Sequence, residues 1–429
     1  MNKQRNWSGY IQWQPKEVLY PGSKEDIIRI IQSAIEKKQK VRAVGSGHSC
    51  TKLCVTDDIL VSLDNYQGIV QIDRANKLVT VKAGTKLNLL NTLLDAENLA
   101  LENLGDIDVQ SAAGAICTAT HGTGVAFGNI SSQVQKIEFI NGRAEIITCS
   151  ENDNSELFRA AQVSLGVLGI ITEITFRCVD SYVLRLNVEK KNLFEVLDNL
   201  DSYNGNCRNF EFYFFPNTDS VMTKELRLSD APPQQKKFKD YIQEDILENY
   251  AFKVACDVAH YLPSTTKRIS EFSANTISSF HKTRKSFEVL SSSRLVRFNE
   301  MEYNVPAECY GDVKKELVRW IDKNNTEVMF PLENRFVKED NILLSPSYQR
   351  KSAYIAAHVY KKADFTRYFK GLEDIFKSYD GRPHWGKMHT VQSKDLEKLY
   401  PEFAKFNTQR KYHDPDEVFL TPYLKELLQ

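Results

Sequence analysis

The sequence lacks an excess of either charge: 56 lysines and arginines balance 56 aspartates and glutamates over 429 residues. A protein that binds nucleic acid without sequence preference needs a basic surplus to displace counterions, so we expect no nucleic-acid partner. No apolar run reaches the about 18 residues that a membrane-spanning helix needs. The first ten residues lack the apolar core of a secretory signal. These absences predict a soluble, cytoplasmic protein with no integral membrane segment.

Several signatures of metal and nucleophilic chemistry are also missing. The eight cysteines are scattered with no C-x-x-C pair, which argues against a zinc ribbon or a small disulfide scaffold. The H-E-x-x-H, G-x-S-x-G and Walker motifs do not occur. We therefore expect reduced thiols and no bound metal, although Cys50 and Cys54 are near enough in sequence to pair.

The length and the hydrophobic pattern predict an α+β protein. A chain of 429 residues exceeds the ~250–300 at which one core stops growing, which favours two domains or one large domain with an insertion. The first 180 residues alternate β-rich runs with helical patterns, and several strands are adjacent, unlike a purely doubly wound sheet. One helix is expected to begin after Ser23, where a capping residue is followed three positions later by Asp26. We expect an exposed loop at 231–237 and helix from there to about residue 295.

A short glycine loop follows the predicted strand 41–44. Its sequence, Gly45-Ser46-Gly47-His48-Ser49, allows backbone N–H groups to crowd around an anion. The alternative is a tight surface turn. A nicotinamide-dinucleotide signature would need glycine where Cys50 stands, and no helix plainly follows, so that kind of site is disfavoured.

Two further segments are rich in small residues. Residues 103–124 contain small side chains almost continuously, and residues 164–171 form another glycine-bearing turn into a strand. Small residues let a flat ligand approach the backbone closely, although a helix packing face is the simpler alternative for 103–124. Three such loops together suit an extended dinucleotide better than one loop does.

Charged residues gather in two places near the end of the chain. Glu333 and Arg335 stand two apart in a probable strand, so their side chains point to one face. The segment 382–389 contains His384, Lys387 and a tryptophan. A lysine and an arginine near each other suit a developing negative charge. A surface salt bridge is the alternative for Glu333 and Arg335.

Taken together, these motifs resemble the vanillyl-alcohol-oxidase-type flavoproteins, and within them the sugar-lactone and alditol oxidases. The pieces that carry the resemblance, in chain order, are 44–49, Asn103-Leu104-Gly105, Thr120-His121-Gly122-Thr123-Gly124, 165–169, 343–346 and 382–387. The resemblance implies an α+β, two-domain PCMH-type fold. Its parts would be an FAD-binding domain (1–178), a mixed-sheet substrate domain (179–388) and a C-terminal segment returning to the FAD domain (389–429).

The resemblance also implies FAD, bound covalently through His48. Relatives with a second covalent bond carry a cysteine near positions 104–110, and none stands here, so we expect one histidyl link. The other positions implied to hold FAD are Val44, Gly45, Ser46, Gly47, Ser49, Gly105, Asp106, Ser111, Gly114, Thr118, His121, Gly122, Gly169 and Ile170.

For catalysis the resemblance implies three residues. Lys387 would contact the reacting hydroxyl, as proton acceptor or as stabiliser of the alkoxide. Arg335 would lie near the flavin edge, and Glu333 would hold substrate hydroxyls. The positions implied to contact the substrate are Asp106, His358, Tyr360 and His384. Asp106 and Tyr360 replace a serine and a threonine of alditol oxidase, which argues against a strict alditol oxidase.

The implied activity is an FAD-dependent oxidase that takes a hydride from a sugar lactone or polyol and returns hydrogen peroxide. An aldono-1,4-lactone is the expected substrate. Gly105 favours oxygen as acceptor, because related dehydrogenases carry alanine there. The alternatives are an alditol or other sugar oxidase, a dehydrogenase with another electron acceptor, and a non-catalytic flavin- or sugar-binding protein. The vertebrate lactone oxidase has an apolar middle segment, whereas residues 236–245 here are charged, so we expect no membrane contact.

Overall fold

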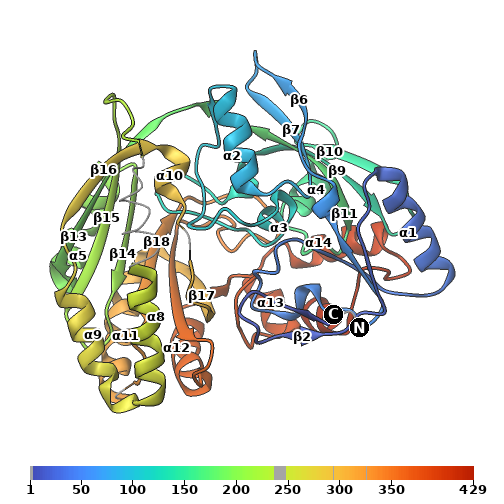
Figure 1. The fold of residues 1–429 in the computed structure, drawn as a ribbon. Helices are drawn as coiled ribbons and strands as arrows, with labels where there is room; N and C mark the ends of the chain where they lie inside the picture. Colours follow the sequence, from blue (N-terminus) through green and yellow to red (C-terminus); the bar gives the residue numbers. More distant parts are fainter. Residues whose placement is uncertain (1–2, 236–247, 293, 325) are drawn as a thin grey trace.

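The computed structural model describes residues 3–235, 248–292, 294–324 and 326–429. It has helices and sheets arranged in two halves, which confirms an α+β protein (Figure 1). The charged segment 236–245 used in the membrane argument lies outside these residues. Within them, no helix is both long and apolar enough to cross a bilayer.

The first half contains two main sheets. A small sheet pairs β3, β5 and β4 in parallel, and a second sheet has the antiparallel order β10-β9-β11-β7-β6. The strands are β1 (Gln4–Arg5), β2 (Gln12–Trp13), β3 (Glu17–Leu19), β4 (Val41–Val44), β5 (Ile59–Ser62), β6 (Ile69–Asp73), β7 (Leu78–Lys82), β8 (Leu99–Ala100), β9 (Val134–Asn141), β10 (Ile146–Ser150), β11 (Gly169–Arg177) and β12 (Val179–Asp180). The helices are α1 (Lys24–Glu36), α2 (Leu87–Ala96), α3 (Ala112–Cys117) and α4 (Ser155–Ala161).

Helix α1 begins where its capping residues predict. The Ser23 hydroxyl accepts the Asp26 N–H at 3.1 Å, and the Asp26 carboxylate accepts the Ser23 N–H at 3.1 Å. This reciprocal pair satisfies two backbone donors that the first turn leaves open. The helix then buries Ile27 and Ile31, which are four residues apart and so lie on one face.

The second half is built on one large sheet with the order β16-β13-β15-β14-β18-β19-β17-β20. All the strand pairs described for this sheet are antiparallel, in contrast to the parallel sheet of β3, β5 and β4 in the first half. The strands are β13 (Val183–Asn192), β14 (Asn209–Phe214), β15 (Ser220–Leu228), β16 (Phe280–Lys285), β17 (Phe298–Pro306), β18 (Leu332–Val337), β19 (Ser352–Tyr360) and β20 (Arg382–Pro383). The helices are α5 (Leu193–Asp198), α6 (Leu200–Asn206), α8 (Glu248–Tyr261), α9 (Thr266–Asn275), α10 (Ser286–Leu290), α11 (Tyr310–Asn324) and α12 (Thr366–Ser378).

The expectation of continuous helix to about residue 295 is wrong at β16. Residues 280–285 pair with the edge of the large sheet, where Lys285 lies opposite Val183 and Phe280 opposite Val188. Pairing with β13 therefore decides the conformation of a segment whose own pattern is ambiguous. The exposed loop at 231–237 is confirmed for residues 231–235, and its last two residues lie outside the described ranges.

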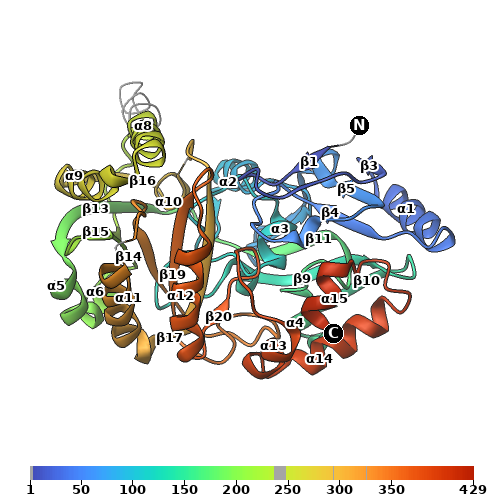
Figure 2. The ribbon, with the colours of Figure 1, turned by 90° about the horizontal axis from the view of Figure 1, so that it is seen from below.

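The end of the chain packs against the first half (Figure 2). Helices α13 (Ser393–Leu399), α14 (Phe403–His413) and α15 (Pro422–Leu428) form this segment. The Val41 N–H donates to the Val418 carbonyl at 2.9 Å, and the Gly142 N–H donates to the His413 carbonyl at 2.9 Å. The buried Arg42 guanidinium donates to the carbonyls of Leu53, Leu165, Gly166 and Phe419. One arginine thus joins the glycine turn at 164–169 to the C-terminal segment.

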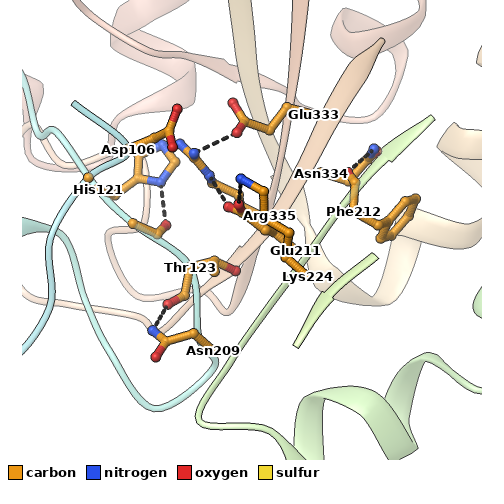
Figure 3. Close-up of polar contacts among 12 residues, drawn as sticks. Asp106, His121, Thr123, Asn209, Glu211, Phe212, Lys224, Glu333, Asn334 and Arg335 are labelled. Carbon is orange, nitrogen blue, oxygen red and sulfur yellow. Dashed lines mark hydrogen bonds and ion pairs between the residues drawn. The ribbon is translucent and has the colours of Figure 1, made fainter. Parts of the chain in front are cut away.

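The segment 103–124 lies directly against strands of the large sheet. The Asn209 amide donates to the Thr123 carbonyl at 2.6 Å (Figure 3). The Gly124 N–H donates to the Phe336 carbonyl at 2.7 Å. These bonds fix the small-residue segment relative to β14 and β18. The charged residues of β18 are therefore placed beside it.

Candidate active site

One cavity of about 1970 Å³ lies between the two halves. This exceeds the roughly 300–1,000 Å³ of ordinary ligand pockets, so it has room for a dinucleotide and a small substrate together. Most of the residues proposed from sequence line it. They are Val44, Gly45, Ser46, Gly47, His48, Ser49, Gly105, Asp106, Ser111, Gly114, Thr118, His121, Gly169, Ile170, Glu333, Arg335, His358, His384 and Lys387.

Gly122 and Tyr360 are not among the residues lining the cavity. A side chain at Gly122 would overlap the Leu104 carbonyl, so glycine is needed there for backbone packing. The Tyr360 hydroxyl donates to the Asp257 carboxylate at 2.8 Å, on the side of helix α8. Neither position contacts the cavity directly.

The glycine loop forms one wall. The His48 ring stacks on Trp7, with centroids 5.1 Å apart and planes inclined by 22°. Burial and the Lys387 charge lower the pKa of His48 to about 4, so its ring is neutral at physiological pH. A Cβ at Gly45 would overlap the Ser111 hydroxyl, which caps α3 by accepting the Gly114 N–H at 3.2 Å. The loop therefore lies directly on the start of the small-residue helix.

Gly105 and Asp106 form the wall next to this helix. A Cβ built on Gly105 would come within 3.2 Å of the His121 carbonyl and of the Thr120 methyl group. The Asp106 carboxylate pairs with Arg294 and accepts the Ser292 hydroxyl at 3.1 Å. Both groups come from the segment after α10, so Asp106 helps to hold the two halves together across the cavity.

Strand β18 places Glu333 and Arg335 on the cavity face, both buried (Figure 3). The Arg335 guanidinium donates to Glu333 at 2.5 Å and to Glu211 at 2.9 Å. Lys224 contacts Glu211 at 2.9 Å. Burial alone would raise the pKa of Glu211, but the charges of Lys224 and Arg335 lower it to about 2. Glu333 and Arg335 therefore belong to a buried ionic network with Glu211 and Lys224. The interpretation of Glu333 and Arg335 as a surface salt bridge is wrong.

Asn334, between these two residues, faces the opposite side of the strand. Its side chain accepts the Tyr310 hydroxyl at 2.9 Å and the Lys314 ammonium at 3.0 Å, both from helix α11. It also donates to the Phe212 carbonyl at 3.1 Å (Figure 3). Helix α11 thus covers the back of β18, which leaves only the other face of the strand open to the cavity.

Strand β17 contributes two buried carboxylates on the same face. Glu300 binds the Lys387 ammonium through one oxygen, and its other oxygen lies 3.5 Å from His358 Nε2. Glu302 lies 3.2 Å from His121 Nε2. Burial would raise the pKa of both acids. The Lys387 and His358 charges instead hold the pKa of Glu300 well below its usual range, and His121 lowers that of Glu302 to about 2.

His384 completes this side of the cavity. Its Nδ1 accepts the Gly386 N–H at 3.0 Å, and burial lowers its pKa to about 3. His121, Glu302 and His384 offer three potential metal-ligand atoms within 4.8 Å of one another. Three protein ligands are too few for a structural zinc site, and the Lys387 charge, which acts on both Glu302 and His384, also opposes a cation at a three-ligand site. The cluster is better described as Glu302 paired with His121, with the His384 ring beside them.

Several charged residues that line this cavity were not predicted from the sequence, namely Lys224, Arg294, Glu300 and Glu302, and neither was Glu211, which pairs with Lys224 and Arg335. A signal existed for two of them. Glu300 and Glu302 are two apart in a strand with no other charged residue, and this period places both side chains on one face. Arg294 had no comparable signal, because it follows α10 in an irregular segment.

The residues present fit FAD. Glycines at 45 and 105 let the backbone of two lining segments pack closely at the cavity wall, where a side chain would collide with Ser111 or crowd Thr120 and His121. Gln110 also lines the cavity, and its buried side-chain carbonyl has no hydrogen-bond partner among the described residues. A flavin ring carries N–H groups that such an acceptor could bind.

Comparison with known proteins agrees with this fit. Residues 15–150 match the FAD-binding-domain model, and residues 174–427 match the model described as D-arabinono-1,4-lactone oxidase. The chain is 34% identical to L-gulono-1,4-lactone dehydrogenase of Mycobacterium tuberculosis, covering 99% of this chain and 98% of the relative. It is 32% identical to L-gulonolactone oxidase of Bos taurus, with coverages of 99% and 98%.

Solved structures show the same fold at lower identity. Cholesterol oxidase from Brevibacterium sterolicum superposes with a TM-score of 0.85 at 16% identity, covering 100% of this chain and 97% of the other. A solvent-stable cholesterol oxidase superposes with a TM-score of 0.86 at 16% identity and the same coverages. With matches to both models and relatives aligned along nearly their whole length, this chain belongs to the D-arabinono-1,4-lactone oxidase family of FAD-binding oxidoreductases.

Proposed function

We propose that this protein is an FAD-dependent oxidase of aldono-1,4-lactones that produces hydrogen peroxide. When bound, FAD accepts a hydride from the substrate and is reoxidised by molecular oxygen. The observation that carries the proposal is the position of Glu333, Arg335 and Lys387, which line the same cavity as the glycine loop. Buried charges of both signs beside a cofactor-sized space suit a small polyhydroxylated substrate.

The roles proposed for these residues follow from their contacts. Glu333 is anchored by Arg335 and by the Tyr213 hydroxyl, and its carboxylate accepts hydrogen bonds from substrate hydroxyls. Lys387 reaches the cavity from the segment 384–387 and contacts the reacting hydroxyl. His358 and His384 complete the substrate wall, and Asp106 acts there together with Arg294.

We also propose that FAD is attached covalently through His48. The neutral His48 ring lines the cavity and is held by stacking on Trp7. A neutral imidazole retains the lone pair that a bond to the flavin 8α-methyl carbon would require. That bond would replace one C–H bond, with the proton lost and two electrons passed to the flavin ring and then to oxygen. The remaining FAD contacts are assigned to the three glycine segments.

Oxygen as electron acceptor is supported by Gly105. Gly105 lines the cavity without a side chain, and a Cβ there would already crowd the His121 carbonyl and the Thr120 methyl group at 3.2 Å. The second candidate is a dehydrogenase, which the name of the mycobacterial relative favours. An alditol oxidase is less favoured, because Asp106 and Tyr360 depart from that enzyme's pattern and Tyr360 lies outside the cavity lining.

We further propose a cytoplasmic location and the domain division 1–178, 179–388 and 389–429. The eight cysteines are free thiols, which suits a reducing compartment. Strand β13 of the large sheet begins at Val183, and the helices packed on the first half begin at Ser393, which supports the two boundaries.

The test is peroxide formation in air with a matched substrate panel. We expect L-gulono-1,4-lactone and D-arabinono-1,4-lactone to produce one peroxide per product molecule, and xylitol and sorbitol to react far more slowly. Flavin reduction by a lactone without peroxide would favour the dehydrogenase. Reaction with alditols alone would replace the substrate class.

A further inference from the structure

We propose that Glu300 is a positioning residue that keeps Lys387 charged, so that Lys387 acts on the substrate as a hydrogen-bond donor and not as a base. The inference rests on the proposed function and deepens it, because it assigns the charge state of the group that contacts the reacting hydroxyl.

The geometry of Glu300 carries the inference. Glu300 stands on β17 opposite His358 of β19, and on the other side its carbonyl accepts the Met388 N–H at 2.8 Å, so backbone contacts on both sides fix its position. One carboxylate oxygen binds Lys387 Nζ, and the other lies 3.5 Å from His358 Nε2. The residue is only 7% exposed, so this ion pair is little screened by solvent. A carboxylate in this setting strongly favours the ammonium form of Lys387.

The other groups around Lys387 do not reverse this preference. Glu302 on β17 adds a second negative charge, and Cys50, which follows the glycine loop, is a thiol. His48 and His384 are neutral, because burial lowers the pKa of each. His358 faces Glu300 from β19. Burial opposes the ammonium, but Glu300 and Glu302 outweigh it and raise the pKa of Lys387.

The chemical consequence concerns the lone pair on Lys387. An ammonium has three N–H donors and no lone pair, so it cannot accept the hydroxyl proton. It donates a hydrogen bond to the substrate oxygen and favours negative charge there as the C–H bond breaks. No bond to Lys387 Nζ forms or breaks in this role. Glu300 acts only through Lys387, by holding its charge and its position.

The first test measures the charge of Lys387 directly in the FAD-loaded protein without substrate. Acetic anhydride modifies only the free amine, and the Lys387 side chain retains 21% exposure to the cavity. Limited labelling across a pH series, followed by peptide mass spectrometry, gives the pH at which Lys387 becomes reactive. The exposed Lys38 in the same sample is the internal reference. We expect Lys387 to react only at higher pH than Lys38; reaction at the same pH would overturn the inference without any variant.

The second test removes the charge of Glu300 with Glu300→Gln. Loss of a neighbouring opposite charge should lower the pH at which Lys387 becomes reactive by about 1 to 3 units. Glu302→Gln is the matched comparison, because Glu302 lies on the same face of β17 and binds His121 instead of Lys387. Its shift should be smaller. Equal shifts in both variants, or none in Glu300→Gln, would contradict the assignment to Glu300.

The pH profile of anaerobic flavin reduction by the lactone tests the role. If Lys387 acts as an ammonium, activity is lost at alkaline pH when Lys387 loses its proton. In Glu300→Gln this loss should occur at a lower pH than in the unmodified protein, by the same number of pH units as the change in labelling. If Lys387 acts as a base, the variant should instead gain activity on the acid side, and the inference fails. Absence of flavin reduction by lactones in the unmodified protein would refute the proposed function alone, since the labelling still decides the charge of Lys387.

Discussion

At the residue scale, the acids that line the cavity or pair with its lining residues are buried and paired. Glu211, Glu300 and Glu333 each contact a lysine or an arginine, and Glu302 contacts His121. An unpaired buried carboxylate would cost several kcal/mol, so each partner is needed to keep its acid ionised. Such a concentration of paired charge beside a large cavity is typical of a functional site.

Replacement of Lys387 by methionine removes the ammonium but keeps a side chain of similar length. We expect the rate of flavin reduction by a lactone to fall roughly 10²–10³-fold, the usual cost of losing one donor to a developing oxyanion. Rapid-mixing absorbance without oxygen measures it. Lys370→Met on helix α12, whose ion pair with Asp374 is solvent-exposed, is the control and should reduce normally. Full activity of Lys387→Met would remove Lys387 from catalysis.

Replacement of His48 by alanine tests the covalent link. In the unmodified protein, acid precipitation should leave the flavin colour in the pellet. In His48→Ala the flavin should pass into the supernatant, because only non-covalent contacts remain. Flavin released from the unmodified protein would show that His48 forms no bond to it.

The sequence predicts a residue of this site when that residue belongs to a local motif. His48, Gly105 and Lys387 stand in compact motifs, and all three line the cavity. Arg294 lines the cavity and pairs with the distant Asp106, and Glu211 pairs with the lining residue Arg335, which is also distant in sequence. Only the fold brings these partners together, so no local pattern could indicate them.

At the scale of elements, the strongest periodic and capping patterns are confirmed. The strand before the glycine loop has its expected bounds, 41–44, and helix α1 begins directly after its predicted capping residue, Ser23. Strand β16 differs, because its conformation depends on pairing with β13, almost a hundred residues earlier in the chain. Local propensity thus predicts elements that have a strong sequence pattern. It fails where pairing with a distant strand determines the conformation.

The capping box of α1 gives a prediction about stability. Ser23→Ala removes the hydroxyl that accepts the Asp26 N–H, and we expect the free energy of unfolding to fall by about 1 kcal/mol. Urea denaturation followed by circular dichroism measures it. Ser33→Ala, inside the same helix, is the control and should not destabilise through capping. Equal stability of Ser23→Ala and the unmodified protein would show that the cap contributes nothing.

At the scale of the whole molecule, the active-site cavity exists only because two halves meet. The first half supplies the glycine loops, and the large sheet supplies the carboxylates, the arginine and His358. Asn209 and Arg294 bond across the junction to Thr123 and Asp106. The same arrangement explains why family resemblance, which spans the whole chain, predicts the fold more completely than any local motif.

The most direct test of the proposed function is the absorbance spectrum of the purified protein before and after anaerobic addition of L-gulono-1,4-lactone, followed by admission of air. We predict a flavin spectrum that bleaches with the lactone and recovers in air with formation of peroxide. A flavin spectrum that the lactone and D-arabinono-1,4-lactone leave unchanged would contradict lactone oxidation by this protein.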